Sequence, residues 1–141
     1  MRCFFDTNVV VYAFDQTAPA KSAVAQRLLA ECIARSDAFL STQVLQEFFT
    51  TVTRKLSTPL PHREAEQAVR ELAKLPIVNA DATLILDAIA LSERYLVSLW
   101  DALIIQAALP AGAEILYTED LQDGQVIDSL TIKNPFAGIQ G

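Results

Sequence analysis

The sequence predicts an α/β domain built around a mainly parallel sheet. Short apolar runs, typical of buried strands, alternate with longer segments in which apolar residues recur every three or four positions, as on one face of a helix. This alternation favours a parallel sheet, because neighbouring parallel strands are usually joined by a crossover helix. The 141 residues, 52% of them hydrophobic, suffice for one core, so we expect a single domain over residues 1–141.

Four short apolar runs are the expected strands. The first covers residues 2–5 and is followed by Asp6 in a turn-forming Asp-Thr-Asn sequence. In parallel sheets, ligands bind beyond the carboxyl ends of the strands. Asp6, after the first run, and Asp120, shortly after the third, are therefore candidates for one shared site. The other three expected strands are residues 38–41, 114–118 and 129–132.

Six segments have the apolar spacing of helices. Residues 44–56 have the clearest apolar face. This face and the apolar face of residues 65–75 are each expected to pack either in the core or in a dimer. Asp81 is expected to cap the start of a helix that includes residues 84–91. Residues 101–109 are almost all apolar, which predicts a buried helix. The remaining expected helices are residues 8–14, 20–34 and 65–72.

Composition excludes several classes of protein. No apolar run reaches the roughly 18 residues that a membrane-spanning helix needs, so we expect a soluble, cytoplasmic protein. The two cysteines, Cys3 and Cys32, provide neither a disulfide framework nor a zinc-binding pair. The net charge of −6 argues against nucleic-acid binding, unless several acidic residues hold a divalent cation that reverses the local field.

Three acidic residues, Asp6, Glu47 and Asp101, each stand alone in a stretch of uncharged residues. A buried carboxylate is costly unless it is protonated, binds a cation or accepts hydrogen bonds. Each also has a purely structural interpretation: Asp6 in a turn, Asp101 in the first turn of a helix, and Glu47 on a solvated polar row with Gln43. Together with Asp120, the three fit one shared site better than separate coincidences.

The chemistry of such a site can be inferred from its ligands. Several carboxylate oxygens suit Mg²⁺ or Mn²⁺ rather than zinc. A metal ion held in this way activates water and stabilises charge on a phosphate, which predicts cleavage of a phosphodiester. His62 is the single histidine, which disfavours metal-free acid–base catalysis, and no G-x-S-x-G, Walker A or GxGxxG motif is present.

Five segments, spread in order over almost the whole chain, form a recognisable pattern. They are Phe4–Val9 (FFDTNV), Thr42–Phe48 (TQVLQEF), Leu99–Ile104 (LWDALI), Leu116–Gly124 (LYTEDLQDG) and Ile132–Phe136 (IKNPF). These segments resemble those of PIN-domain nucleases. In order, spacing and total length, the chain is similar to the VapC-type toxins of bacterial toxin–antitoxin pairs.

The resemblance implies a three-layer α/β/α fold with a central parallel sheet. It also implies an acidic quartet around one or two Mg²⁺ or Mn²⁺ ions, in which Asp6 and Asp101 are the most direct ligands, Asp120 binds directly or through water, and Glu47 completes the site. Family members hydrolyse RNA with metal-activated water and leave a 5′-phosphate and a 3′-hydroxyl. The expected supporting residues are Asn8 and Thr118, with Asp123 adding negative charge at the rim.

The resemblance further implies binding partners. VapC-type proteins commonly form homodimers, and a small antitoxin inhibits them by packing its C-terminal segment into the active-site groove. We also expect Arg54 and Lys55 to contact the RNA backbone, the alternative being that they are solvated basic residues at a helix end. Trp100 stands where many relatives have tyrosine, and we expect it to be an aromatic packing residue.

Two other functions are compatible with the sequence. One is a non-catalytic PIN-fold module that binds a protein partner, which loss of quartet acids would indicate; none is lost. The other is a Mg²⁺-dependent phosphatase with an aspartyl nucleophile, but such enzymes usually have D-x-D where this chain has Asp6-Thr7-Asn8. Even for a nuclease, a housekeeping role is an alternative to the toxin role.

Overall fold

The computed structural model describes residues 1–139, so the last two residues of the expected domain lie outside the described part. A six-stranded sheet runs through its centre in the order β3-β2-β1-β4-β6-β5, and all neighbouring strands are parallel except the antiparallel β5 and β6. The strands are β1 (Cys3–Phe5), β2 (Ala38–Ser41), β3 (Ile77–Val78), β4 (Ile115–Tyr117), β5 (Val126–Ile127) and β6 (Leu130–Lys133).

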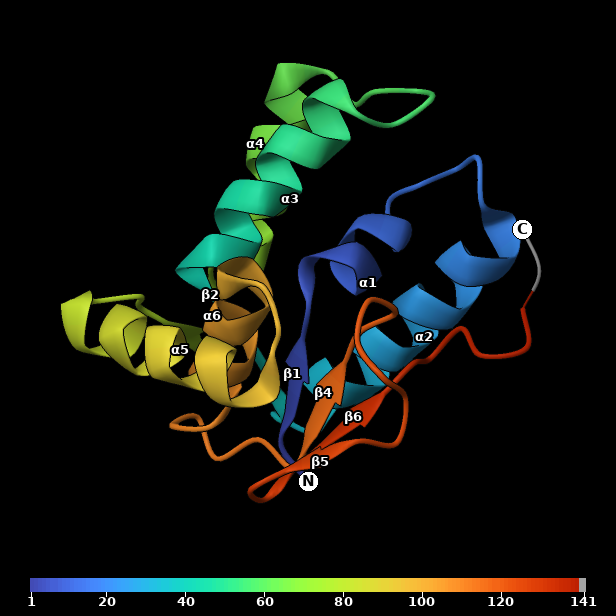
Figure 1. Ribbon diagram of the computed structural model, residues 1–141. Helices are drawn as coiled ribbons and strands as arrows, with labels where there is room; N and C mark the ends of the chain where they lie inside the picture. Colours follow the sequence, from blue (N-terminus) through green and yellow to red (C-terminus); the bar gives the residue numbers. More distant parts are fainter. Residues whose placement is uncertain (140–141) are drawn as a thin grey trace.

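Helices flank both faces of the sheet, giving the expected three-layer α/β/α arrangement (Figure 1). Helices α5 and α6 pack together on one side, and α2 lies on the other. The six helices of the described residues are α1 (Thr7–Tyr12), α2 (Pro19–Ala34), α3 (Thr42–Arg54), α4 (His62–Leu72), α5 (Ala82–Tyr95) and α6 (Leu99–Ala108). None of these helices is both long enough and apolar enough to cross a membrane.

The four expected strands and six expected helices are all present, with shifted ends. Strands β3 and β5 were not expected, because two residues are too few to leave a periodic signal. Asp81 caps α5 as predicted, since its side chain accepts a hydrogen bond from the Leu84 amide at 2.9 Å. Helix α6 begins two residues earlier than expected, which places Trp100 and Asp101 in its first turn.

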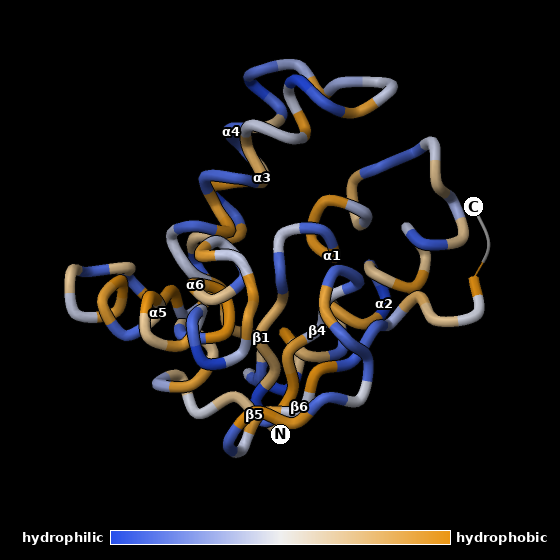
Figure 2. Tube along the Cα trace, viewed as in Figure 1, coloured by the Kyte–Doolittle hydropathy of each residue, from blue (hydrophilic) through white to orange (hydrophobic). Residues whose placement is uncertain are grey.

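The core is centred on β1 and α6. All three residues of β1 are buried, and the side chains of Phe4 and Phe5 have no exposed surface. Each such side chain contributes about 1.5–3 kcal/mol by leaving water. Six of the ten residues of α6 are buried, as its apolar sequence predicted. Figure 2 shows these hydrophobic segments at the centre of the molecule and polar segments towards the outside.

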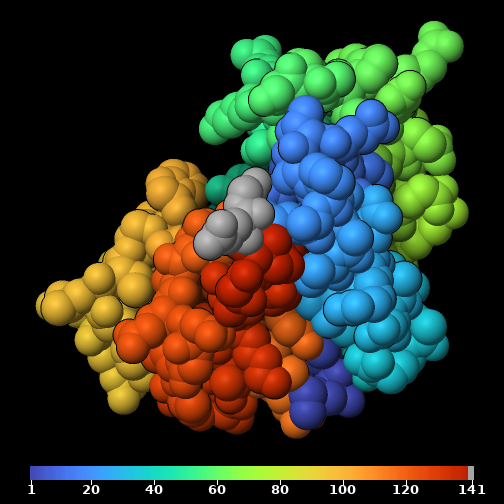
Figure 3. Space-filling view, turned by 90° about the vertical axis from the view of Figure 1, so that its right-hand side faces the viewer, coloured from blue at the N-terminus to red at the C-terminus, as the bar shows by residue number. Residues whose placement is uncertain are grey.

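The end of the described chain packs back onto the N-terminal helices. Phe136 meets Tyr12 of α1 edge-on, with ring centroids 5.0 Å apart, and the ammonium group of Lys21 in α2 lies 5.6 Å from the Phe136 ring. Figure 3 shows the red C-terminal segment against the blue segment that includes α2 on this face. The contact holds α1, which follows the first strand directly, in place beside the sheet.

The sheet topology brings distant residues to one edge. Strand β1 pairs in parallel with both β2 and β4, so the three strands end on the same side. Asp6 follows β1, α3 begins directly after β2, and Thr118 follows β4. The Asp6 amide donates a hydrogen bond to the Tyr117 carbonyl at 3.0 Å, which fixes these two strand ends against each other.

Candidate active site

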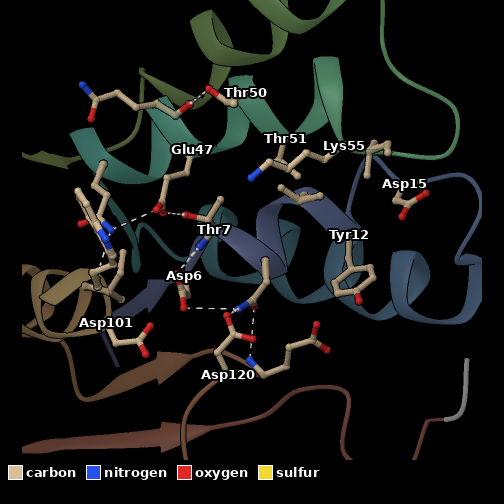
Figure 4. A pocket seen from close by; sticks show the side chains of 18 residues that line it. Asp6, Thr7, Tyr12, Asp15, Glu47, Thr50, Thr51, Lys55, Asp101 and Asp120 are labelled. Carbon is tan, nitrogen blue, oxygen red and sulfur yellow. Dashed lines mark hydrogen bonds between the residues drawn. The ribbon is translucent and has the colours of Figure 1, made fainter. Parts of the chain in front are cut away.

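A pocket of about 590 Å³ lies at this edge of the sheet, and six acidic residues line it, among them the four expected ones (Figure 4). Asp6 follows β1, Glu47 lies in α3, Asp101 in the first turn of α6, and Asp120 after β4. Residues up to 114 positions apart in the sequence (Asp6 to Asp120) therefore face one space. These are the four acids that the sequence placed in one site.

Asp6 is the most buried of the four, with 5% of its surface exposed. Its Oδ1 accepts a hydrogen bond from the Thr7 amide at 2.7 Å, and its Oδ2 accepts one from the Thr118 hydroxyl at 2.8 Å. The pKa of Asp6 is nevertheless raised to about 6, mainly because the carboxyl is buried. The hydrogen bonds lower it, and the charges of Asp120 and Glu47 add to the rise. A cation in the pocket would relieve this penalty.

Asn8 and Thr118 connect Asp6 to Asp120. The Asn8 amide nitrogen donates to Asp120 Oδ2 at 2.9 Å, to the Thr118 hydroxyl at 3.3 Å and, at the longer distance of 3.5 Å, to Asp6 Oδ2. The Asp120 backbone amide donates to the same Thr118 hydroxyl at 3.1 Å. The two residues expected to support the quartet thus contact two of its carboxylates directly.

Glu47 is oriented by two neighbours. Its Oε1 accepts a hydrogen bond from the Thr7 hydroxyl at 2.7 Å, and its Oε2 accepts one from the Gln43 amide at 3.4 Å. The same Gln43 nitrogen lies 3.3 Å from the Trp100 carbonyl, so it also links α3 to α6. Gln43 is only 8% exposed, and the interpretation of its helix row as merely solvated is wrong at this position.

The sequence contained a usable signal for Gln43 but not for Thr7. Gln43 precedes Glu47 by four residues, a spacing at which helical side chains meet. The contact between Thr7 and Glu47 joins residues 40 positions apart and depends on how α1 packs against α3. No local pattern predicts such a contact.

Asp101 lies both at a helix start and in the pocket, so the structural and the functional interpretation of this residue both apply. It lies in the first turn of α6, where its amide donates to the capping hydroxyl of Ser98 at 3.1 Å. Partial burial raises its pKa, with smaller contributions from the charges of Asp120 and Glu47. Its carboxylate therefore belongs to the same mutually repelling group as the other three.

The donor chemistry of the pocket fits a hard divalent cation. Within residues 1–139, none of the four carboxylates forms an ion pair with a basic residue. In the same residues, no group of three acidic, histidine or cysteine side chains is arranged so that it could hold a metal ion. Mg²⁺ typically binds through one or two carboxylates and keeps several water ligands, so it does not require a complete protein cage.

Two further acids line the pocket. Asp15 accepts hydrogen bonds from the Thr17 amide and hydroxyl, at 2.9 and 2.6 Å. Glu119 is different because it is paired with a basic residue. Its Oε2 lies 3.0 Å from the ammonium group of Lys21, which also approaches the Tyr12 hydroxyl at 3.3 Å. The pairing raises the pKa of Lys21. Sequence reasoning missed this pair, whose members are 98 positions apart. Glu119 is thus neutralised by a neighbour, whereas Asp120 beside it is not.

Of the remaining residues that the sequence singled out, some line the pocket and others lie outside it. Lys55 lines the pocket, but Arg54 does not. Asp123 is also outside the pocket lining; its Oδ1 accepts a hydrogen bond from the Asn134 amide at 2.8 Å and so ties two loops together. The expectation that Trp100 is a packing residue is wrong, because 63% of its surface is exposed and it lines the pocket.

The sequence pattern of the PIN domain family matches residues 3–122 of this chain. No protein of curated function matches the chain at the sequence level. Among solved structures, a toxin–antitoxin complex from Klebsiella pneumoniae is similar at a TM-score of 0.70 and 20% identity, covering 94% of this chain and 97% of that one.

Two further solved structures share the fold. VapC20 of Mycobacterium tuberculosis, a toxin that cleaves the sarcin–ricin loop, matches at a TM-score of 0.67 and 23% identity, covering 84% of this chain and 89% of that one. DNA-bound VapBC from Salmonella typhimurium matches at a TM-score of 0.65 and 16% identity, covering 96% of this chain and 98% of that one. At these identities the likeness establishes the fold.

Proposed function

The chain belongs to the PIN domain family, and we propose from this that it is a Mg²⁺- or Mn²⁺-dependent endoribonuclease, the toxin of a toxin–antitoxin pair. One observation carries the proposal: four carboxylates from four separate elements line one pocket, and none of them is paired with a basic residue within residues 1–139. The toxin role is supported by the solved toxins and toxin–antitoxin complexes that have the same fold.

Asp6, Asp101 and Asp120 are the residues that would hold the metal. Bound there, Mg²⁺ or Mn²⁺ would lower the pKa of a water molecule and stabilise the charge that develops on the phosphate. Glu47 faces the same pocket, held by Thr7 and Gln43, and can accept a hydrogen bond from the attacking water. Hydrolysis adds water across the bond between phosphorus and the 3′ oxygen, which leaves a 5′-phosphate and a 3′-hydroxyl.

Lys55 is the residue that we propose for backbone contact with RNA. Figure 4 shows it beyond Thr51, towards the end of the pocket away from Asp101 and Asp120. It follows Glu47 by eight residues, which corresponds to about 12 Å along a helix. Lys55 would therefore contact a phosphate other than the one being cleaved. Arg54 has no such position, and the proposal leaves it out.

Two protein partners also belong to the proposal. A segment of an antitoxin would bind in the pocket, and a second copy of the chain would form a homodimer. The expected apolar face of α3 is not available for a dimer, because Val44, Phe48 and Val52 are fully buried. Exposed large apolar side chains instead concentrate on α5 and the start of α6; besides Trp100, they are Ile85, Leu86, Ile89, Leu96 and Leu99.

The test is RNA cleavage by purified protein with and without Mg²⁺ or Mn²⁺. We expect metal-dependent cleavage that is lost in Asp6→Asn and in Asp101→Asn. Asp123→Asn is the matched control, because it makes the same chemical change outside the pocket and keeps an acceptor for the Asn134 amide. Equal cleavage by all four proteins would mean that the activity does not come from this pocket. If the wild type, free of antitoxin, cleaved no RNA, a non-catalytic module would be favoured.

A further inference from the structure

Trp100 has an unusual position for a tryptophan. It is the single tryptophan of the chain, 63% of its surface is exposed, and it lines the acidic pocket. Large aromatic side chains are usually well covered in folded proteins, because they bury more apolar surface than any other type. An indole left in water beside a pocket therefore indicates a contact that forms with a ligand.

The backbone that carries this indole is well fixed. Trp100 lies in the first turn of α6, whose start is capped by Ser98, and its carbonyl accepts a hydrogen bond from Gln43 of α3 at 3.3 Å. The next residue is Asp101, one of the four carboxylates of the pocket. The indole is thus carried by the residue next to a proposed metal ligand.

The pocket has one other aromatic ring, and that ring is already engaged. Tyr12 meets Phe136 edge-on at 5.0 Å, and the ammonium group of Lys21 lies 4.7 Å from its ring centroid. In the described part of the chain, no aromatic ring or basic side chain packs on the Trp100 indole. Trp100 is therefore the ring that can stack on a ligand.

Few basic side chains are available in this pocket to attract the phosphates of RNA. The chain has a net charge of −6, and among the described residues that line the pocket Lys55 is the single basic one. Affinity for nucleic acid that does not come from phosphate contacts can come from stacking of bases on aromatic side chains. Stacking of this kind requires a base that is not paired in a duplex.

We propose that the Trp100 indole binds the substrate by stacking on an unpaired nucleobase next to the cleaved phosphodiester. This inference rests on the proposed nuclease function. It concerns Trp100 separately from the other exposed apolar residues, such as Leu86 and Ile89, because these two do not line the pocket.

Intrinsic fluorescence tests the proposal directly, because all tryptophan emission comes from Trp100. The Asp6→Asn chain, expected to bind RNA without cutting it, is titrated with a short single-stranded RNA of mixed sequence. The same RNA annealed to its complement, and versions with one abasic position each, serve as comparisons. We expect the single strand to quench the emission, the duplex to quench it less, and one abasic position to abolish most of the quenching.

Affinity is measured in parallel from the anisotropy of labelled RNA, with further substitutions added to Asp6→Asn. Trp100→Ala should weaken binding roughly five- to hundredfold, whereas Trp100→Phe should retain most of the affinity. Val126→Ala is the matched control and should leave affinity unchanged, because this exposed apolar side chain of β5 lies outside the pocket. Light scattering reports the subunit mass of each variant.

The failure of this inference differs from the failure of the proposed function. RNA binding with unchanged fluorescence, or Trp100→Ala that binds like its parent, would overturn stacking while metal-dependent cleavage by the wild type still stood. A change of subunit mass in Trp100→Ala with RNA affinity intact would make Trp100 an interface residue and also overturn stacking. Quenching without any cleavage by the wild type would support stacking and contradict the nuclease.

Discussion

Replacing Asp6 with asparagine should change how the stability of the metal-free protein depends on pH. The carboxylate is 5% exposed, and its neighbours Glu47 and Asp120 are also acidic. Asparagine has nearly the same shape and keeps an acceptor for the Thr7 amide, but it carries no charge. The substitution therefore removes the buried charge with little change in packing.

The magnitude follows from the pKa of Asp6. It lies near 6 in the folded protein against an ordinary value of 3.8, a difference worth about 3 kcal/mol at about 1.36 kcal/mol for each pKa unit. Because the folded pKa is the higher one, this stability is fully present below the ordinary pKa and is lost as pH rises through the folded pKa. Between about pH 4.5 and about pH 7.5, the wild type should lose about 2 kcal/mol relative to Asp6→Asn.

Urea unfolding in EDTA at those two pH values measures this difference. A hydrogen bond lost in Asp6→Asn lowers its free energy of unfolding equally at both pH values. The quantity to compare between the two proteins is therefore the change in the free energy of unfolding from one pH to the other. Asp123→Asn, which alters an exposed carboxylate, should follow the wild type. The same gap between Asp6→Asn and wild type at both pH values would refute the conclusion that Asp6 is a buried, destabilised charge.

Three other substitutions test parts of the site. Thr118→Val removes the hydroxyl that donates to Asp6 and should lower the free energy of unfolding by about 1–3 kcal/mol, measured with urea; Thr118→Ser should restore most of it. Lys55→Ala should weaken RNA binding equally for all sequences and reduce the salt dependence of the binding constant by about one charge; an unchanged slope would remove Lys55 from the interface. Gln43→Ala frees Glu47 and should lower kcat, in cleavage assays, more than it changes KM.

Much of the fold could be predicted because its elements leave local signals. The runs at residues 2–5 and 114–118 became β1 and β4, and the rule that ligands bind beyond the carboxyl ends of parallel strands placed Asp6 and Asp120 together. Glu47 and Asp101 were recognisable as lone charges in apolar sequence. These signals depend only on residue type and short-range spacing.

The rest depends on contacts between distant segments. Strand β3 has two residues and exists through its pairing with β2, which its sequence does not reveal. The pairing of Lys21 with Glu119 decides which acid in the pocket is neutralised, and 98 residues separate the two. Trp100 resembles a core residue by type, and only its position in the first turn of α6 shows that it faces the pocket.

Binding of Mn²⁺ by isothermal titration calorimetry is the measurement closest to the central claim, that the unpaired carboxylates of this pocket hold a divalent cation. The wild type should bind Mn²⁺ without RNA present, and binding should weaken strongly in Asp6→Asn and in Asp101→Asn. Asp123→Asn should bind like the wild type, because its carboxylate lies outside the pocket. Equal Mn²⁺ binding by all four proteins, or none by the wild type, would contradict the account.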